Sequence, residues 1–179
     1  FIRFDGVYMD SKVYVNGSAY TTAYAYAPGA ESGQTTALVQ EITQPGENHS
    51  YAYDNVGNIV SAARNGVTTT YAYDALGQLI RVNDPNDGTW TYEYDCGGNI
   101  LNKKQYAYTT GTLGTVQQIA SYAYGDSDWK DKLTRYNGVD IAYDAIGNPI
   151  HDGVWAYTWE NGRQLRRMAC DATVAEFVY

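Results

Sequence analysis

The stretch TTTYAYDALGQLIRV, residues Thr68–Val82, encodes one complete β-hairpin. Tyr71 and Tyr73 lie two residues apart, so in a strand they point to the same face. Asp74 and Gly77 mark the ends of a four-residue turn, because aspartate at the first position accepts a backbone hydrogen bond and glycine at the fourth adopts a positive φ without steric cost. A type I turn followed by a left-handed glycine is a common hairpin connection and carries a bulge. The stretch therefore predicts a strand, a turn and a second strand.

This hairpin pattern recurs along the chain. YAYDNVGNI begins at Tyr51, YEYDCGGNI at Tyr92 and IAYDAIGNP at Ile141. We interpret the repeated aspartates as caps of their own turns, rather than as catalytic acids or calcium ligands, because each has a local backbone partner. The predicted turn residues are Asp54, Gly57, Asp74, Gly77, Asp95, Gly98, Asp144 and Gly147.

A second type of turn alternates with the first. Asn-Gly between two strand-like runs is the strongest short hairpin signal in a sequence, and Asn86-Asp87-Gly88 is similar in kind. Two alternating turns predict an all-β protein whose tandem antiparallel hairpins form an extended, twisted or curled meander sheet. The Asn-Gly pairs are Asn16-Gly17, Asn65-Gly66, Asn137-Gly138 and Asn161-Gly162.

The turn positions also predict which residues lie opposite one another. Cross-strand pairs of an aromatic and an aliphatic side chain stabilise a sheet by about 0.2–1 kcal/mol each. The expected pairs are Tyr53 with Ile59, Tyr73 with Leu79, and Tyr71 with Arg81.

Spacing of the motifs divides the chain into three parts. Residues 1–50 contain degenerate repeats and an irregular linker, in which AESGQTTALVQEITQPGENHS (residues 30–50) has no assignment. Residues 51–168 hold the repeats, and residues 169–179 begin a further strand or repeat. The motifs span 51–59, 71–79, 92–100, 122–150 and 157–165. Because the chain starts at Phe1 without a methionine and stops within a strand-like run, we expect it to be excised from a longer protein.

Composition excludes several classes of function. The formal net charge is −8 and the richest basic stretch is the short RQLRRM of Arg163–Met168, so there is no basic face for nucleic acid. Cys96 and Cys170 are too far apart in sequence to suggest a disulfide framework or a zinc site. The sequence contains no apolar run long enough to span a bilayer. No cofactor motif is present, since the recurring glycines lack the strand-to-helix context of a phosphate loop.

The remaining polar residues do not form a recognisable catalytic or calcium-binding pattern. His49 and His151 have no identifiable catalytic partners. The acidic cluster of residues 126–131 lacks the glycine and the bidentate glutamate of a calcium loop, and Lys130 occupies a ligand position.

The tyrosines allow two interpretations. Nineteen are present, and in the repeats they alternate with small residues, which predicts one bulky and one small face. Such aromatic rows fasten neighbouring hairpins by packing, and they can also stack on sugars. The ladder comprises Tyr51, Tyr53, Tyr71, Tyr73, Tyr92, Tyr94, Tyr122, Tyr124, Tyr143, Tyr157 and Trp159.

From Tyr51 to about Met168 the chain resembles the YD-repeat family, also called RHS (rearrangement hotspot) repeats. Four copies of the YDxxG motif carry the resemblance, and the segments Tyr122–Ile150 and Tyr157–Leu165 resemble a block found in secreted YD-repeat proteins of Gram-positive bacteria. The resemblance implies a segment of a large secreted or cell-surface bacterial protein. In toxins and teneurins of this family, hairpins add side by side into a spiral shell, which in the toxins encloses a C-terminal toxic domain. Carbohydrate binding is also associated with the family.

The sequence departs from the toxin pattern at one point. Toxin shells end in a DPxG-like self-cleavage site, whereas the only Asp-Pro here is Asp84-Pro85, within an ordinary repeat. We therefore expect a non-enzymatic wall segment without cleavage site or cargo. The alternative is an adhesin module for cell-wall or surface carbohydrate; a glycosidase is the weakest reading, because no pair of acids stands apart from the turns. The expected partners are neighbouring repeats, an enclosed toxin domain and carbohydrate, with neither nucleic acid nor membrane insertion.

Overall fold

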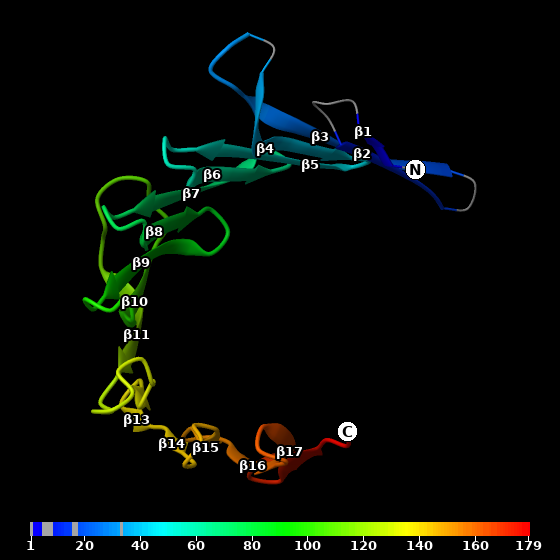
Figure 1. Ribbon diagram of the computed structural model, residues 1–179. Coiled ribbons are helices and arrows are strands. Elements are labelled where there is room, and N and C mark those ends of the chain that lie inside the picture. The colour runs from blue at the N-terminus through cyan, green and yellow to red at the C-terminus, as the bar shows by residue number, and fades with distance from the viewer. Residues whose placement is uncertain (1, 5–8, 16–17, 33) are drawn as a thin grey trace. The chain divides into compact units, whose positions relative to one another are not determined.

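The computed structural model describes residues 2–4, 9–15, 18–32 and 34–179, and in these ranges it contains strands and turns but no helix (Figure 1). The described residues accordingly include no helix capable of spanning a membrane. The chain forms two compact units, one of Phe1–Thr91 with Gln105–Val116 and one of Tyr92–Lys104 with Gln117–Tyr179. The fold is all-β, as the sequence predicts.

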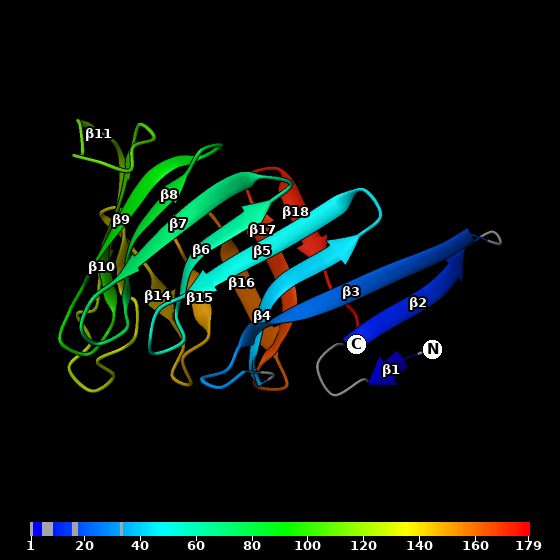
Figure 2. The same ribbon diagram turned by 90° about the horizontal axis from the view of Figure 1, so that it is seen from above.

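In the first unit each strand pairs antiparallel with the next one in sequence. Figure 2 shows β5 to β8 side by side with alternating directions. The strands are β1 (Ile2–Phe4), β2 (Met9–Val15), β3 (Ser18–Pro28), β4 (Thr35–Gln44), β5 (Glu47–Tyr53), β6 (Ile59–Arg64), β7 (Val67–Tyr73), β8 (Leu79–Asp84) and parts of β9 (Gly88–Tyr94) and β10 (Ile100–Tyr106).

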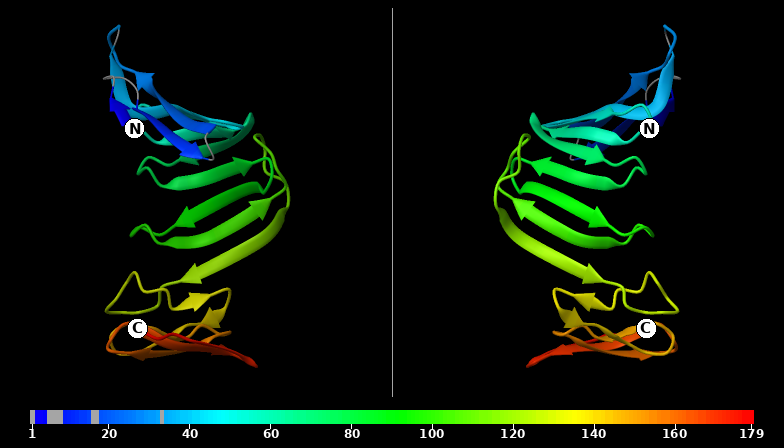
Figure 3. Two further views of the ribbon diagram at one scale, coloured as in Figure 1. Left: turned by 90° about the vertical axis from the view of Figure 1, so that its right-hand side faces the viewer. Right: turned by 90° about the vertical axis from the view of Figure 1, so that its left-hand side faces the viewer.

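The second unit continues the same plan with shorter strands. Its last five strands form a separate antiparallel sheet, whose final strands are coloured orange and red in Figure 3. The strands are β11 (Val116–Ala123), β12 (Arg135–Tyr136), β13 (Val139–Asp140), β14 (Ala142–Tyr143), β15 (Pro149–His151), β16 (Ala156–Glu160), β17 (Gln164–Cys170) and β18 (Thr173–Glu176).

Asparagine and glycine form the second type of turn, as expected. Asn65 and Gly66 have φ values of 49° and 83°, and they join β6 to β7 with Arg64 opposite Val67. Positive φ at both positions is the type I′ geometry that matches the twist of a hairpin. Asn137-Gly138 and Asn161-Gly162 also have positive φ. Asn16-Gly17 lies outside the described residues.

Strand register differs from the prediction at one position. Tyr53 lies opposite Ile59 and Tyr73 opposite Leu79 as predicted. Tyr71, however, faces Val82, so the predicted pairing with Arg81 is wrong. A β-bulge adds Ile80 to β8, which shifts every later residue of that strand by one. Equivalent shifts occur in β5–β6 and β16–β17.

Few side chains are fully buried. Tyr106 is the one buried apolar side chain among the described residues for which burial is given, and the buried polar side chains include Asn83 and the fully enclosed Thr89. Each hairpin therefore depends on contacts with its neighbours more than on a deep core, as is usual for repeat proteins.

Candidate functional site

Asp54 shows how the first type of turn is built. Its Oδ1 accepts hydrogen bonds from the backbone N–H groups of Val56 (3.0 Å) and Asn58 (2.8 Å), and the Asn58 side chain donates to Oδ2 (2.9 Å). Gly57 has a φ of 93° and donates its N–H to the carbonyl oxygen of Asp54. The other copies repeat this geometry at Asp74 and Gly77, Asp95 and Gly98, and Asp144 and Gly147.

These bonds lower the pKa of several turn aspartates. In Asp95 the side-chain hydrogen bond from Asn99 is the largest cause, followed by the backbone N–H of the same residue. In Asp54 and Asp144 desolvation is the largest single effect and raises the pKa, but the hydrogen bonds together outweigh it and the pKa is lowered. The ionised carboxylates are therefore occupied within their own turns.

The second aromatic residue of a copy is bonded to the preceding hairpin. The hydroxyl of Tyr73 donates to the carbonyl oxygen of Ile59 (2.8 Å), the first strand residue after the preceding turn. Trp159 replaces tyrosine in the last copy, and its Nε1 donates to Pro149 (2.6 Å). Other second tyrosines also donate to a backbone carbonyl oxygen earlier in the chain: Tyr53 to Val39, Tyr124 to Ile100 and Tyr143 to Leu133.

Sequence reasoning missed this use of the hydroxyl. One signal was available, because tryptophan and tyrosine both carry a donor at the far end of the ring whereas phenylalanine does not. Tyr94 occupies the corresponding position on β9.

The first tyrosine of each copy has a more varied environment. The Tyr157 hydroxyl donates to Asp152 (2.7 Å), which raises the pKa of Tyr157 to about 12. Tyr122 packs against Tyr136 with ring centroids 5.2 Å apart. Tyr92 lies under the ammonium group of Lys103.

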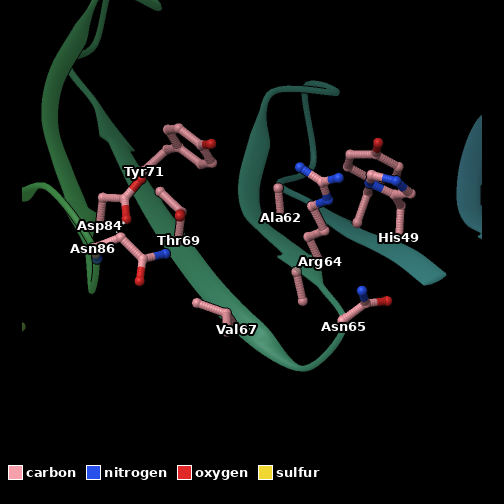
Figure 4. Close-up of a pocket in the computed structure, with 11 residues that line it drawn as sticks. His49, Ala62, Arg64, Asn65, Val67, Thr69, Tyr71, Asp84 and Asn86 are labelled. Atoms are coloured by element: carbon pink, nitrogen blue, oxygen red, sulfur yellow. Dashed lines mark hydrogen bonds between the residues drawn. The ribbon is translucent and has the colours of Figure 1, made fainter. Parts of the chain in front are cut away.

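Tyr51 and Tyr71 differ from these, because their hydroxyls have no hydrogen-bond partner among the described residues. Both rings border a groove of about 520 Å³ on the first unit (Figure 4). Ala62 and Thr69 also line it, from β6 and β7, and Asp84 lines it at the end of β8.

The groove exists because short side chains lie between the two tyrosines. Tyr51 lies opposite Ala62, which in turn lies opposite Thr69. In the next copy along the chain, Tyr71 lies opposite Val82, which in turn lies opposite Trp90. The equivalent positions of that copy therefore hold larger residues than Ala62 and Thr69.

Charges near the groove are partly compensated. Arg64 contacts Glu47 through Nε (2.6 Å), and His49 contacts the same carboxylate oxygen (2.9 Å). The Asp84 Oδ1 accepts a hydrogen bond from the backbone N–H of Asn86 (2.8 Å). The other Asp84 oxygen and the Asn86 side chain have no partner among the described residues.

The remaining polar candidates have local structural roles. Asp126 accepts two backbone hydrogen bonds and pairs with Lys132, whose side-chain contact is the main reason that its pKa is lowered to about 2. His151 accepts a hydrogen bond from the backbone of Gly153 (2.9 Å). The described part of the chain contains no group of three side chains suited to holding a metal ion, and Cys96 and Cys170 are free thiols.

Comparison with known proteins finds similarity over part of the chain. A family model described as RHS Repeat matches residues 53–87 and 73–112. The chain is 33% identical over 135 residues to the tRNA3(Ser)-specific nuclease WapA of Bacillus spizizenii, a match that covers 70% of this chain and 5% of that protein.

A solved structure that matches the chain has the same fold. The crystal structure of TcdB2-TccC3-TEV matches with a TM-score of 0.62 and 14% identity over 95% of this chain and 11% of that one. A Photorhabdus luminescens Tc holotoxin pore matches with a TM-score of 0.48 and 14% identity over 90% and 12% of the two chains. At this identity the first likeness concerns the fold alone.

Proposed function

We propose that this chain, whose residues 53–87 and 73–112 match the RHS Repeat family model, forms non-catalytic wall in a larger secreted or cell-surface protein. The observation that carries the proposal is the internal use of the repeated polar groups. Turn aspartates bind their own turns, and the hydroxyls of second tyrosines bind the preceding hairpin. Side chains bonded in this way hold neighbouring hairpins together and are not available to bind or activate a substrate.

The larger protein, in this proposal, encloses or delivers a C-terminal toxin domain. The fold is similar to that of TcdB2-TccC3-TEV, and the chain spans only 5% of the length of WapA, a protein named as a nuclease. Any catalytic activity would then reside in another part of the parent protein. The repeats would supply its container.

Protease protection tests the proposal. The full-length parent protein is treated with trypsin, and survival of its C-terminal domain is followed by mass spectrometry. We expect that domain to be protected in the intact protein and digested when the repeats carry Gly57→Val and Gly77→Val together. Equal digestion in both proteins would contradict enclosure. Sequencing the parent gene beyond Tyr179 provides an independent check, since a wall anchor or stalk in place of an unrelated domain would favour adhesion.

Carbohydrate binding is the second candidate function. The groove between Tyr51 and Tyr71 favours it, because two aromatic rings and several unpaired polar groups converge there. The sugar-contact role of the other ladder residues, and the division of the chain at residues 50 and 168, stay predictions. A glycan array probed with the chain tests this second function.

A further inference from the structure

We propose that the groove between Tyr51 and Tyr71 binds one pyranose unit of a neutral polysaccharide. The inference rests on the proposed carbohydrate-binding role and adds to it a site and a class of ligand. Its experiment separates failure of the site from failure of that role.

The tyrosine hydroxyl groups at the groove differ from those elsewhere in the repeats. Second tyrosines such as Tyr53 and Tyr73 donate to backbone carbonyl groups, so their hydroxyls are committed to the sheet. The side chains of Tyr51 and Tyr71 are half-buried, and their hydroxyls have no hydrogen-bond partner among the described residues. A half-exposed ring with a free hydroxyl provides a stacking surface and a polar group for a sugar ring.

The groove is large enough for a sugar ring. Ala62 and Thr69 lie between the two tyrosines, and the resulting groove of about 520 Å³ falls within the range of ligand sites in proteins. In the next copy the equivalent positions hold the larger residues Val82 and Trp90. The small residues that flank this groove are therefore not repeated in that copy.

Two polar side chains lie at the end of the groove. One carboxylate oxygen of Asp84 and the side-chain amide of Asn86 line the groove without a partner among the described residues. A carboxylate oxygen accepts from hydroxyl groups, and an amide both donates and accepts. These groups match the hydroxyl groups around a pyranose ring.

The charged groups near the groove disfavour an anionic ligand. Glu47 compensates the nearby Arg64, Asp84 adds a negative charge, and the chain as a whole has a formal net charge of −8. An anionic polymer is repelled by this arrangement, whereas a neutral one is not. The groove therefore favours neutral sugars over polymers of uronic acids or phosphates.

Calorimetric titration tests the site with the 179-residue chain and a panel of neutral polysaccharides: dextran, laminarin, mannan and galactan. Polygalacturonate serves as the anionic probe. The variant Ala62→Val places in the groove the side chain that the next copy already tolerates. Ala72→Val is the matched control, because Ala72 is exposed and lies on the opposite face of the neighbouring strand. Circular dichroism verifies that both variants are folded.

We expect at least one neutral polysaccharide to bind, with an affinity that Ala62→Val lowers about tenfold or more and that Ala72→Val leaves unchanged. Tyr71→Phe and Asp84→Asn keep the shape of the groove and should each weaken the same binding. Equal binding by wild type and Ala62→Val would refute the site while leaving the carbohydrate role intact. Binding of polygalacturonate alone would refute the neutral class, and failure of every glycan to bind would refute both proposals.

Discussion

Tyr71 and Tyr73 lie on the same face of one strand, but their hydroxyl groups have different surroundings. Tyr73 donates to the carbonyl oxygen of Ile59, whereas Tyr71 has no hydrogen-bond partner among the described residues. Removing a satisfied hydrogen bond costs about 0.5–1.5 kcal/mol. Tyr73→Phe should therefore lower the free energy of unfolding by about 1 kcal/mol, and Tyr71→Phe should leave it nearly unchanged. Urea denaturation of the two variants measures the difference, and equal losses would contradict the structural role of the Tyr73 hydroxyl.

Gly77 has a positive φ of 77°, and no atom lies within 4 Å of the position a Cβ would take. A substitution there is opposed by backbone strain rather than by a steric clash. Gly77→Val should be destabilising by about 1 kcal/mol or more, because β-branched residues fit poorly at positive φ. Ala75→Ser, at an exposed position of the same turn, should be almost silent. Thermal melting compares the two, and identical midpoints would show that Gly77 has no conformational role.

Asp126 should make the free energy of unfolding depend on pH. Its pKa in the folded state is lowered to about 2, mainly by Lys132 and then by two backbone N–H groups. An aspartate in an unfolded chain has a pKa of about 3.9. The stabilisation is thus complete above about pH 4 and is lost as the pH falls towards 2.

Asp126→Asn should lower the melting temperature at pH 6, and the gap to wild type should close towards pH 2. Asp131→Asn provides the control, since Asp131 has no hydrogen bond among the described residues. A gap that is constant between pH 6 and pH 2 would mean that the charge of Asp126 does not contribute.

At the level of elements, an insertion is anchored within the first unit by polar contacts. Residues 107–115 join β10 to β11, and Arg81 donates through Nη2 to the carbonyl oxygens of Thr109 (2.8 Å) and Gly111 (2.9 Å). The buried Thr89 exchanges hydrogen bonds with the backbone of Thr109 on both sides. Together these contacts satisfy backbone groups of a segment that has no ladder partner.

Arg81→Ala should release this insertion without unfolding the repeats. We expect chymotrypsin to cleave faster after the half-exposed Tyr108, because local opening becomes easier. Arg135→Ala removes an exposed pair with Asp140 elsewhere and should leave the cleavage rate unchanged. Mass spectrometry of the fragments locates the cut, and an unchanged rate in Arg81→Ala would contradict the proposed anchoring.

The sequence predicts these elements well where turn chemistry is explicit. Asn65-Gly66 and the hairpins around it follow from local propensities alone. Residues 30–50 had no assignment, although β4 and β5 form there and meet at Pro45-Gly46, where Gly46 has a φ of 80°. Pro-Gly is itself a turn signal, although no YDxxG motif accompanies it here.

Other features depend on contacts between distant residues. The bulge at Ile80 changed the partner of Tyr71. The turn chemistry predicts a bulge in this hairpin, but it does not fix the residue at which the bulge falls. The groove likewise needs Ala62 on one strand and Thr69 on the next to coincide between two tyrosines. Such coincidences follow from register, which must be known before they can be recognised.

At the level of the whole molecule, stability is expected to be a sum over neighbouring hairpins, because few side chains are fully buried. Deleting residues 59–78 removes one full period and joins Asn58 to Leu79, which restores an Asp-x-x-Gly turn followed by a strand. This variant should remain folded. Deleting residues 67–78 instead removes only β7 and the turn after it, and should disrupt the alternation of turns. Circular dichroism and melting curves compare the two, and equal behaviour would contradict a modular chain.

The bond from a ring donor to the preceding hairpin has a direction. In every contact of this kind described above, the acceptor comes earlier in the chain than the donor: Ile59 precedes Tyr73, and Pro149 precedes Trp159. A ribosome therefore releases each acceptor before the side chain that needs it. Each new hairpin can therefore bond to hairpins that are already synthesised. The sheet can grow from its N-terminal end during translation, because no bond of this kind requires a later segment.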